Sequence, residues 1–318
     1  ALDKLYALPF TRRAHPSYTE AIPALDMIQF SITAHRGCGG GCAFCSLALH
    51  QGRRIQSRSA ASIEAEARRM TEHPAWRGSV SDVGGPTANM WGATCVRPGG
   101  ECTRKSCLTP RKCAHFRTDQ RAWLDLLKRV ERLPGVRHVR VASGIRHDLA
   151  LEDPTFTGEF LARFVGGQVK LAPEHCSEFV LRLMRKPSFT TFADFLTVFE
   201  RVSRRSGKEQ YIVPYLLSGL PGCRDVDMRD LAHWFRRQGW RPQQVQCFVP
   251  TPGTVATAMF HACIAPDGSK LAVAKTDAQR LKQHGILFED EDADGPSLDR
   301  MVGHKPPPSR EERKRPRR

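Results

Sequence analysis

Short apolar runs alternate along this chain with segments whose apolar residues recur at helical spacing. The apolar runs predict strands, at 27–33, 78–85, 136–143, 167–173, 209–218 and 244–250. The segments with helical spacing predict helices, at 59–72, 120–133, about 159–165, 178–185, 191–206 and 227–238. Ser59 or Ser62 is the expected N-terminal cap of the first of these helices.

This alternation predicts the fold class. About six strand–helix units with short links are typical of a parallel sheet covered by helices. Right-handed crossovers would curl such a sheet, so we expect an α/β fold of the partial (β/α)6 barrel type, related to the TIM barrel. In that architecture the loops after the C-terminal strand ends build the active site. Here those loops are glycine-rich and polar, for example VGGPTAN and ASGIRHD.

The loop after the first predicted strand reads GCGGGCAFC and holds Cys38, Cys42 and Cys45. A segment with so many glycines is unsuited to a hydrophobic core. A disulfide would pair two of the three cysteines and leave the third unpaired. Three thiolates suit a four-iron cluster in which one iron has no protein ligand and can bind a small molecule. A zinc site completed by a distant Cys or His is the alternative.

A second cysteine-rich window, CVRPGGECTRKSCLTPRKC, contains Cys95, Cys102, Cys107 and Cys113. A segment this rich in Pro, Gly, Arg and Lys cannot form a hydrophobic core, and a bound metal would substitute for one. Four thiolates suit tetrahedral zinc or an auxiliary [4Fe-4S] cluster, and His115 could replace one of them. Unliganded thiols are the remaining alternative. Four isolated cysteines are predicted as small core or loop residues: Cys176, Cys223, Cys247 and Cys263.

The composition indicates in which cellular compartment the protein is found. No run in the 318 residues approaches the roughly 18 consecutive apolar residues that span a bilayer, so we expect no membrane association. The sequence shows no signal peptide and no initiator Met, so we expect a fragment of a longer protein. Eleven cysteines, odd in number and clustered, favour metal binding in a reducing cytoplasm over a disulfide scaffold.

The chain is strongly basic, with a formal net charge of +16. Part of this charge lies in residues 304–318, HKPPPSREERKRPRR, which we expect to be a disordered basic tail. The remaining charge permits an acidic partner such as nucleic acid without identifying one. A nucleic-acid-binding protein with structural zinc sites, or an iron–sulfur electron carrier, is therefore an alternative to an enzyme.

The first cysteine loop, with Phe44 before its third cysteine, resembles the CxxxCxφC motif of the radical S-adenosylmethionine (radical SAM) superfamily. Further stretches resemble the YgiQ family of these proteins from about residue 5 to 260, among them SDVGGPTANMWG, KLAPEHC and GKEQYIVPYLLSGLPGCRDVDM. The resemblance implies a further N-terminal domain in family members, which we expect to be missing from this sequence as from a fragment. The expected organisation is a lead-in (1–26), a radical SAM core (27–260) with a Cys-rich insertion at about 90–118, an extension (261–303) and the basic tail.

The resemblance implies a mechanism. Cys38, Cys42 and Cys45 would each bind one iron of a [4Fe-4S] cluster, and the fourth iron would take the amino and carboxylate groups of S-adenosylmethionine. Reductive cleavage would give methionine and a 5′-deoxyadenosyl radical that abstracts hydrogen from an unidentified substrate. A small reductant protein of the flavodoxin or ferredoxin type is the expected partner.

The same resemblance implies further cofactor contacts. Phe44 would support the adenine, and Gly84 with Gly85 would approach the methionyl amino group. Pro86 stands where the superfamily's motif has Glu, so a side-chain contact is not expected at that position. Contacts to ribose or carboxylate are expected from later strand ends, at Ser143 with Gly144 and at Glu174 with His175.

Overall fold

The computed structural model describes residues 1–99 and 102–289. The predicted basic tail and the end of the predicted extension lie outside these described residues. The first half of the chain forms α1 (Leu2–Tyr6), α2 (Leu25–Ile28), β1 (Ser31–Thr33), β2 (His35–Arg36), α3 (Leu47–His50), β3 (Gln56–Ser57), α4 (Ala60–Thr71), β4 (Ser79–Val80), β5 (Asp82–Gly84), η1 (Ala88–Met90), β6 (Thr94–Cys95), β7 (Phe116–Arg117), α5 (Gln120–Glu131) and β8 (His138–Val139).

The second half carries longer elements. They are α6 (His147–Ala150), α7 (Pro154–Phe164), β9 (Gln168–Glu174), α8 (Glu178–Met184), α9 (Phe189–Ser206), β10 (Tyr211–Ser218), α10 (Asp225–Arg237), β11 (Gln244–Cys247), α11 (Val255–Ala262) and α12 (Asp277–Gly285).

Parallel pairing joins the main strands in chain order. β1 pairs with β5, β4 pairs with β8, and β10 lies between β9 and β11, all in parallel. A parallel bridge between Ile145 and Leu171 connects the segment after β8 to β9. The α/β class predicted from the sequence is confirmed.

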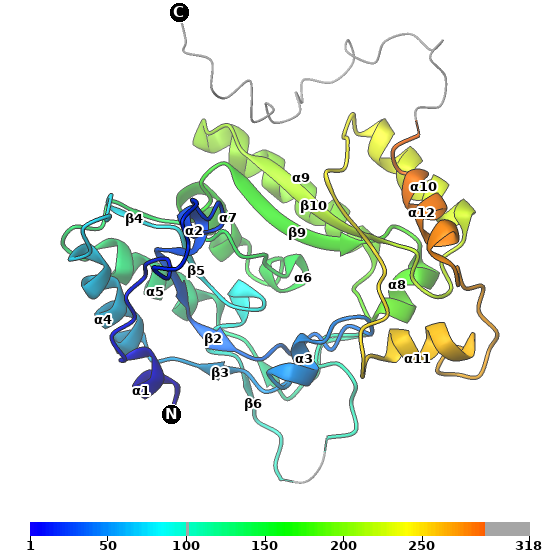
Figure 1. Ribbon diagram of the computed structural model, residues 1–318, viewed down its shortest axis with the longest axis horizontal. Helices are drawn as coiled ribbons and strands as arrows, with labels where there is room; N and C mark the ends of the chain where they lie inside the picture. The colour runs from blue at the N-terminus through cyan, green and yellow to red at the C-terminus, as the bar shows by residue number, and fades with distance from the viewer. Residues whose placement is uncertain (100–101, 290–318) are drawn as a thin grey trace, which may run out of the picture.

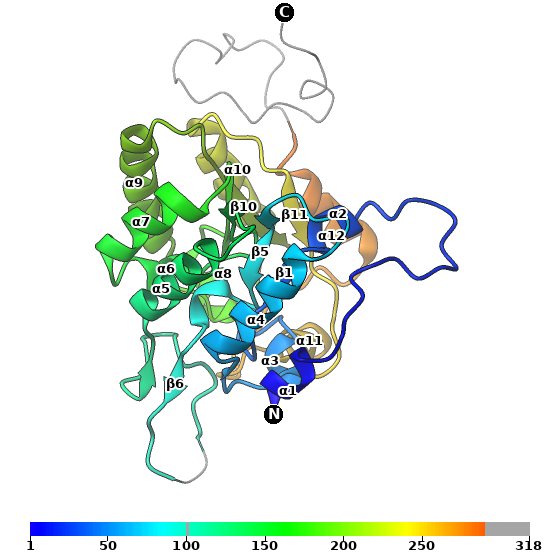
Figure 2. The same ribbon diagram turned by 90° about the vertical axis from the view of Figure 1, so that its left-hand side faces the viewer.

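Helices cover this strand series as the alternation predicts. α4 contacts α5, α5 contacts α7, and α7 contacts α9. Figure 1 shows α9 along one side of β9 and β10, with α3, β2 and β3 on the opposite side. In Figures 1 and 2 the segment around β6 protrudes from the body of the molecule. In the described part of the chain no helix is long and apolar enough to cross a membrane.

Several predicted boundaries were wrong. The predicted strand 27–33 is extended only over Ser31–Thr33, because α2 already takes up Leu25–Ile28. The predicted strand 78–85 divides into β4 and β5, which pair with different neighbours. α7 begins earlier than predicted because Asp153 caps it, accepting from the amide of Thr155 at 3.0 Å, and Pro154 suits a first helical turn. Ser59 is the cap of α4, accepting from the amide of Ser62 at 3.1 Å.

Aromatic side chains fill the core between the helices and the strands. Trp123 of α5 and Phe156 and Phe160 of α7 are all at most 1% exposed. The two phenylalanine rings stack with centroids 5.6 Å apart, and the indole of Trp123 lies 5.4 Å from the ring of Phe160. This packing holds α5 against α7 and so fixes the strands whose ends carry the candidate site.

Phe160→Ala should therefore lower the free energy of unfolding by about 3–5 kcal/mol, the usual loss for a buried phenylalanine. Phe10→Ala is the control, because the Phe10 side chain is 57% exposed, and it should change the unfolding free energy by less than about 1 kcal/mol. Urea denaturation followed by circular dichroism measures both. Equal losses in the two variants would contradict this description of the core.

Candidate functional site

The three-cysteine loop lies between β2 and α3 and is anchored through its backbone. The amide of Cys38 donates to the carbonyl of Gly52 at 3.1 Å, and the amide of Ala43 donates to the carbonyl of Met184 at 2.9 Å. The carbonyl of Ala43 accepts from the amide of Ala256 at 2.9 Å. Contacts from the segment after α3, from the end of α8 and from α11 thus hold the loop in place.

Two thiols of this loop, those of Cys38 and Cys42, flank a point beside Gly40. A Cβ added at Gly40 would lie 3.4 Å from Sγ of Cys38 and 3.7 Å from Sγ of Cys42. The same point is 3.5 Å from Nη1 of Arg146. Cys45 is partly buried like the other two. Ionisation of Cys42 or Cys38 would raise the pKa of its thiol. A side chain at position 40 would therefore occupy space between the sulfurs and a cation.

The second cysteine window packs directly on this loop. The amide of Cys107 donates to the carbonyl of Gly39 at 2.9 Å, and the hydroxyl of Ser106 donates to the carbonyl of Gly40 at 2.5 Å. Gly41 has φ +58°, and a Cβ there would lie 2.2 Å from the carbonyl oxygen of Lys105. The sequence did not predict this contact between the two windows.

The four thiols of the second window differ in exposure. Cys95 and Cys102 are exposed, whereas Cys107 and Cys113 are partly buried, and the amide of Cys113 donates to the carbonyl of Cys107 at 2.8 Å. Burial raises the pKa of Cys107, and the nearby thiols of the other three add to this rise. Cys107 and Cys113 share a small core with Cys38, formed by Met90, Ala93, Leu108, Phe116 and Leu149.

Two ion pairs flank the first loop, and the side chains of their four residues are between 6% and 19% exposed. Arg146 pairs with Asp148, and Lys186 pairs with Glu174 at 3.4 Å. Burial raises the pKa of Cys42, and the cations Lys186 and Arg146 partly offset that rise. Burial also raises the pKa of Cys45. Because a metal-bound cysteine is a thiolate, these cations favour the form that binds metal.

Gly84 and Gly85 lie where the sequence predicted, at the end of β5. A Cβ at Gly84 would meet the hydroxyl of Ser143 at 2.2 Å, and one at Gly85 would meet the His35 ring at 2.5 Å. The Ser143 hydroxyl donates to Asp82, a residue that the sequence analysis missed. His35 is fully buried with no hydrogen-bond partner on either ring nitrogen, and burial lowers its pKa to about 4.

The remaining predicted contacts have mixed surroundings. Glu174 ends β9 with φ +67°, a conformation that is rare outside glycine, and its carboxylate pairs with Lys186. Phe44 is partly buried and packs on the apolar cluster around Leu216 and Phe248. His175 is fully buried, and its ring nitrogens contact the amide of Ser177 and the thiol of Cys223, so the protein itself occupies them.

The donor set and the space fit an iron–sulfur cluster. Three partly buried thiols share one anchored loop, the glycines between them leave room, and two cations stand close by. Among the described residues, no three Cys, His, Asp or Glu side chains already stand together as a metal site. Binding would therefore require the thiols to turn toward a common centre.

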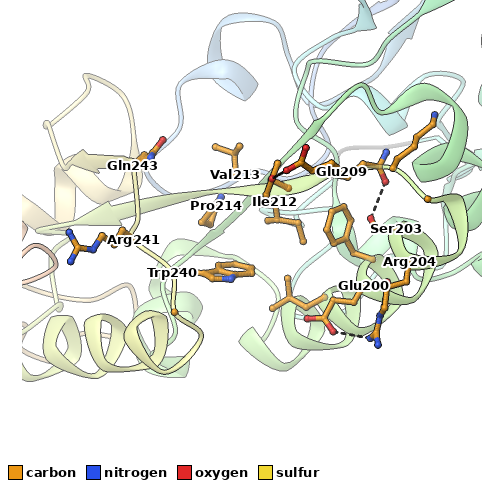
Figure 3. A pocket seen from close by; sticks show the side chains of 17 residues that line it. Glu200, Ser203, Arg204, Glu209, Ile212, Val213, Pro214, Trp240, Arg241 and Gln243 are labelled. Atoms are coloured by element: carbon orange, nitrogen blue, oxygen red, sulfur yellow. Dashed lines mark hydrogen bonds and ion pairs between the residues drawn. The ribbon is translucent and has the colours of Figure 1, made fainter. Parts of the chain in front are cut away.

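A cavity of about 790 Å³ lies elsewhere in the fold. The end of α9, the start of β10 and the indole of Trp240 line it, and Figure 3 shows Glu200 and Arg204 paired at its edge. No cysteine lines this cavity, and it opens at the strand ends opposite to Glu174 and Ser218. We place the candidate site at the cysteine loop, because that is where the reactive side chains gather.

Relatives of this chain are UPF0313 proteins. One from Geobacter sulfurreducens is 49% identical over 290 residues, covering 90% of this chain and 48% of its own length. One from Methanosarcina acetivorans is 46% identical over 289 residues, covering 90% and 39%. The UPF0313 protein YgiQ of Salmonella typhimurium is 42% identical over 308 residues, covering 93% and 42%. The chain thus spans less than half the length of these relatives.

One family model and several solved structures that match this chain are described as radical SAM proteins. Residues 1–31, which include the predicted lead-in, match the family model described as Radical SAM N-terminal. The radical S-adenosylmethionine methyltransferase TsrM of Kitasatospora setae, with tryptophan and a SAM analogue bound, aligns with TM-score 0.52 at 15% identity. That alignment covers 91% of this chain and 58% of TsrM. TsrM with cobalamin and a [4Fe-4S] cluster bound gives 0.51, again at 15% identity, over 79% and 43%.

The parallel strand series and this structural likeness define an α/β chain with the fold of radical SAM proteins. Within that class, the chain belongs to the UPF0313 family, which includes YgiQ. The sequence match covers more of the chain than the four-fifths over which the motifs suggested it.

The glycines of the loop allow a direct test of the contact between the two windows. Gly41 and Gly52 both have positive φ, +58° and +84°, but a Cβ at Gly52 meets nothing within 4 Å. Gly52→Ala should lower the free energy of unfolding by roughly 1–2 kcal/mol, because alanine is strained at a positive φ. Gly41→Ala should cost about 1–3 kcal/mol more, because its methyl group would collide with the backbone at Lys105. Denaturant unfolding measures both variants, and equal losses would contradict the close approach.

Proposed function

We propose that this chain is a radical SAM enzyme that reductively cleaves S-adenosylmethionine and acts on a substrate not yet identified. The observation that carries the proposal is the anchored loop with Cys38, Cys42 and Cys45, which follows β1, the first strand of the parallel series, and the short β2. We further propose that this series forms a partial (β/α)6 barrel, in which the loops after β1, β5, β8 and β9 face one site. Membership of the UPF0313 family and the likeness to TsrM support this assignment.

The chain's own residues would prepare the site. Cys38, Cys42 and Cys45 would hold a [4Fe-4S] cluster, which when bound supplies the electron that cleaves the carbon–sulfur bond of S-adenosylmethionine. Gly84 and Gly85 would admit the methionyl group at the end of β5, since any side chain there would displace Ser143 or His35. Phe44 would support the adenine, and Ser143 and Glu174 would contact the ribose or the carboxylate.

The electron requires a donor. We propose a small reductant protein of the flavodoxin or ferredoxin type, whose acidic surface would suit a chain of net charge +16.

Substituting the three cysteines tests the function. Cys38→Ala, Cys42→Ala and Cys45→Ala should each abolish formation of 5′-deoxyadenosine in anaerobic, reconstituted protein with dithionite, because each thiolate holds its own iron. Cys247→Ala is the matched control, a partly buried cysteine at the end of β11, and should keep the activity. Liquid chromatography of the nucleoside products gives the readout.

Other outcomes of this assay separate the alternatives. Retained turnover in any of the three variants would overturn the assignment. Colourless protein that contains zinc and no iron would favour a nucleic-acid-binding protein with structural zinc sites. Brown protein that never cleaves S-adenosylmethionine would favour an electron carrier.

We also propose that Cys95, Cys102, Cys107 and Cys113 bind a second metal, either zinc or an auxiliary iron–sulfur cluster. Two observations support it: the amide of Cys113 donates to the carbonyl of Cys107 at 2.8 Å, which brings two of the four cysteines together, and their segment has few apolar residues. Thiolate–metal bonds contribute on the order of 10 kcal/mol, enough to order such a segment.

Metal analysis of a variant without the first site tests this second site. The triple variant Cys38→Ala/Cys42→Ala/Cys45→Ala should retain either one zinc or about four iron per chain, which are the stoichiometries of the two candidate sites. Adding Cys107→Ala should release that metal and expose the segment around Arg104 and Lys105 to trypsin. Adding Cys263→Ala instead is the control. Metal-free triple variant, or unchanged trypsin cleavage, would show that the window contains only reduced cysteines.

A further inference from the structure

Arg146 is a buried cation aimed at the three-cysteine loop. Its side chain is 8% exposed, and Nη1 lies 3.5 Å from the point beside Gly40 that Sγ of Cys38 and Sγ of Cys42 also flank. Its other two guanidinium nitrogens, Nε and Nη2, donate to the two carboxylate oxygens of Asp148. One edge of the guanidinium therefore binds Asp148, and Nη1 lies nearest to the sulfurs of Cys38 and Cys42.

The backbone around Arg146 is fixed by hydrogen bonds on both sides. Its amide donates to Oδ1 of Asn89 at 2.8 Å, and Nδ2 of Asn89 donates to the carbonyl of Arg146 at 3.0 Å. Gln120 supports Asn89 in turn, donating to its carbonyl at 2.9 Å. Asn89 is only 1% exposed. The loops after β5 and β8 are thus joined at Arg146, which restricts where its side chain can lie.

The charges of this pair act on the loop from a largely buried position, because the Arg146 side chain is 8% exposed and the Asp148 side chain 19%. Asp148 and the thiols of Cys42 and Cys38 raise the pKa of Arg146 even though its burial opposes this. Burial would by itself raise the pKa of Asp148, but Arg146 lowers it instead. Both groups are therefore charged near neutral pH, and buried charges interact more strongly than exposed ones.

We propose that the Arg146–Asp148 pair sets the reduction potential of the cluster at Cys38, Cys42 and Cys45, with Arg146 raising the potential and Asp148 lowering it. This inference rests on the proposed function. In the step concerned, the oxidised cluster accepts one electron from an external reductant and becomes more negative by one charge. A nearby cation stabilises that product and a nearby carboxylate destabilises it.

Redox titration of the unsubstituted protein and of four variants, monitored by low-temperature electron paramagnetic resonance without S-adenosylmethionine, tests the pair. Arg146→Gln should lower the potential and Asp148→Asn should raise it. We expect each shift to reach about tenfold in the equilibrium constant for reduction, which is 59 mV for a one-electron couple. Arg146→Lys should keep most of the original potential, because it keeps the charge.

Arg204→Gln is the matched control, since it removes an arginine that is 78% exposed at the end of α9, and it should leave the potential unchanged. Equal potentials in all cluster-loaded variants would overturn the inference, as would shifts of Arg146→Gln and Asp148→Asn in the same direction. If Arg146→Gln loses the cluster, Asp148→Asn alone provides the test: a raised potential supports the inference, and a lowered potential overturns it. Loss of the cluster from every Arg146 and Asp148 variant would show that the pair is structural.

Iron analysis of the unsubstituted protein separates this inference from the proposed function. An unsubstituted protein that binds no cluster overturns both. An unsubstituted protein that binds the cluster and cleaves S-adenosylmethionine, with potentials that do not respond to these charges, overturns the inference alone.

Discussion

The candidate site depends on a steric constraint at Gly39, Gly40 and Gly41. A Cβ at Gly39 would lie 2.9 Å from the ring of Phe116, and one at Gly41 would lie 2.2 Å from the carbonyl oxygen of Lys105. Because these positions carry no side chain, the second cysteine window can approach the first through backbone hydrogen bonds. The same freedom leaves space beside Gly40 for the sulfurs and Arg146. One run of glycines thereby brings both cysteine windows and a buried cation to the same place.

Charge balance is the second requirement of this site. Three partly buried thiols and two largely buried ion pairs lie around one loop, and burying charge is costly unless partners lie close. Arg146 and Lys186 each have a carboxylate partner, Asp148 and Glu174, so each cation enters the interior already neutralised as a pair. The fold can then hold cations beside the cysteines without leaving an isolated charge. This arrangement makes a polar, reactive site compatible with a stable interior.

The sequence predicted the α/β fold class, and it singled out the residues of the candidate site, because both depend on local patterns. The helix at 120–133 was found by its apolar spacing, and Cys38, Cys42 and Cys45 by their own spacing. Contacts between distant segments were not predictable. Nothing in the segment from Cys95 to Cys113 indicates that it packs on Gly39, and nothing in ASGIRHD indicates that Arg146 lies beside two cysteines. A charged residue in a loop at a strand end was the only available signal for Arg146.

In the proposed function, the three-cysteine loop holds a cluster with one iron open to S-adenosylmethionine. The most direct measurement is the low-temperature electron paramagnetic resonance spectrum of the reduced, reconstituted protein before and after S-adenosylmethionine is added. We expect the g-values to change, because the open iron would gain amino and carboxylate ligands. A spectrum that S-adenosylmethionine leaves unchanged, or a protein with no iron–sulfur signal at all, would contradict the proposed function.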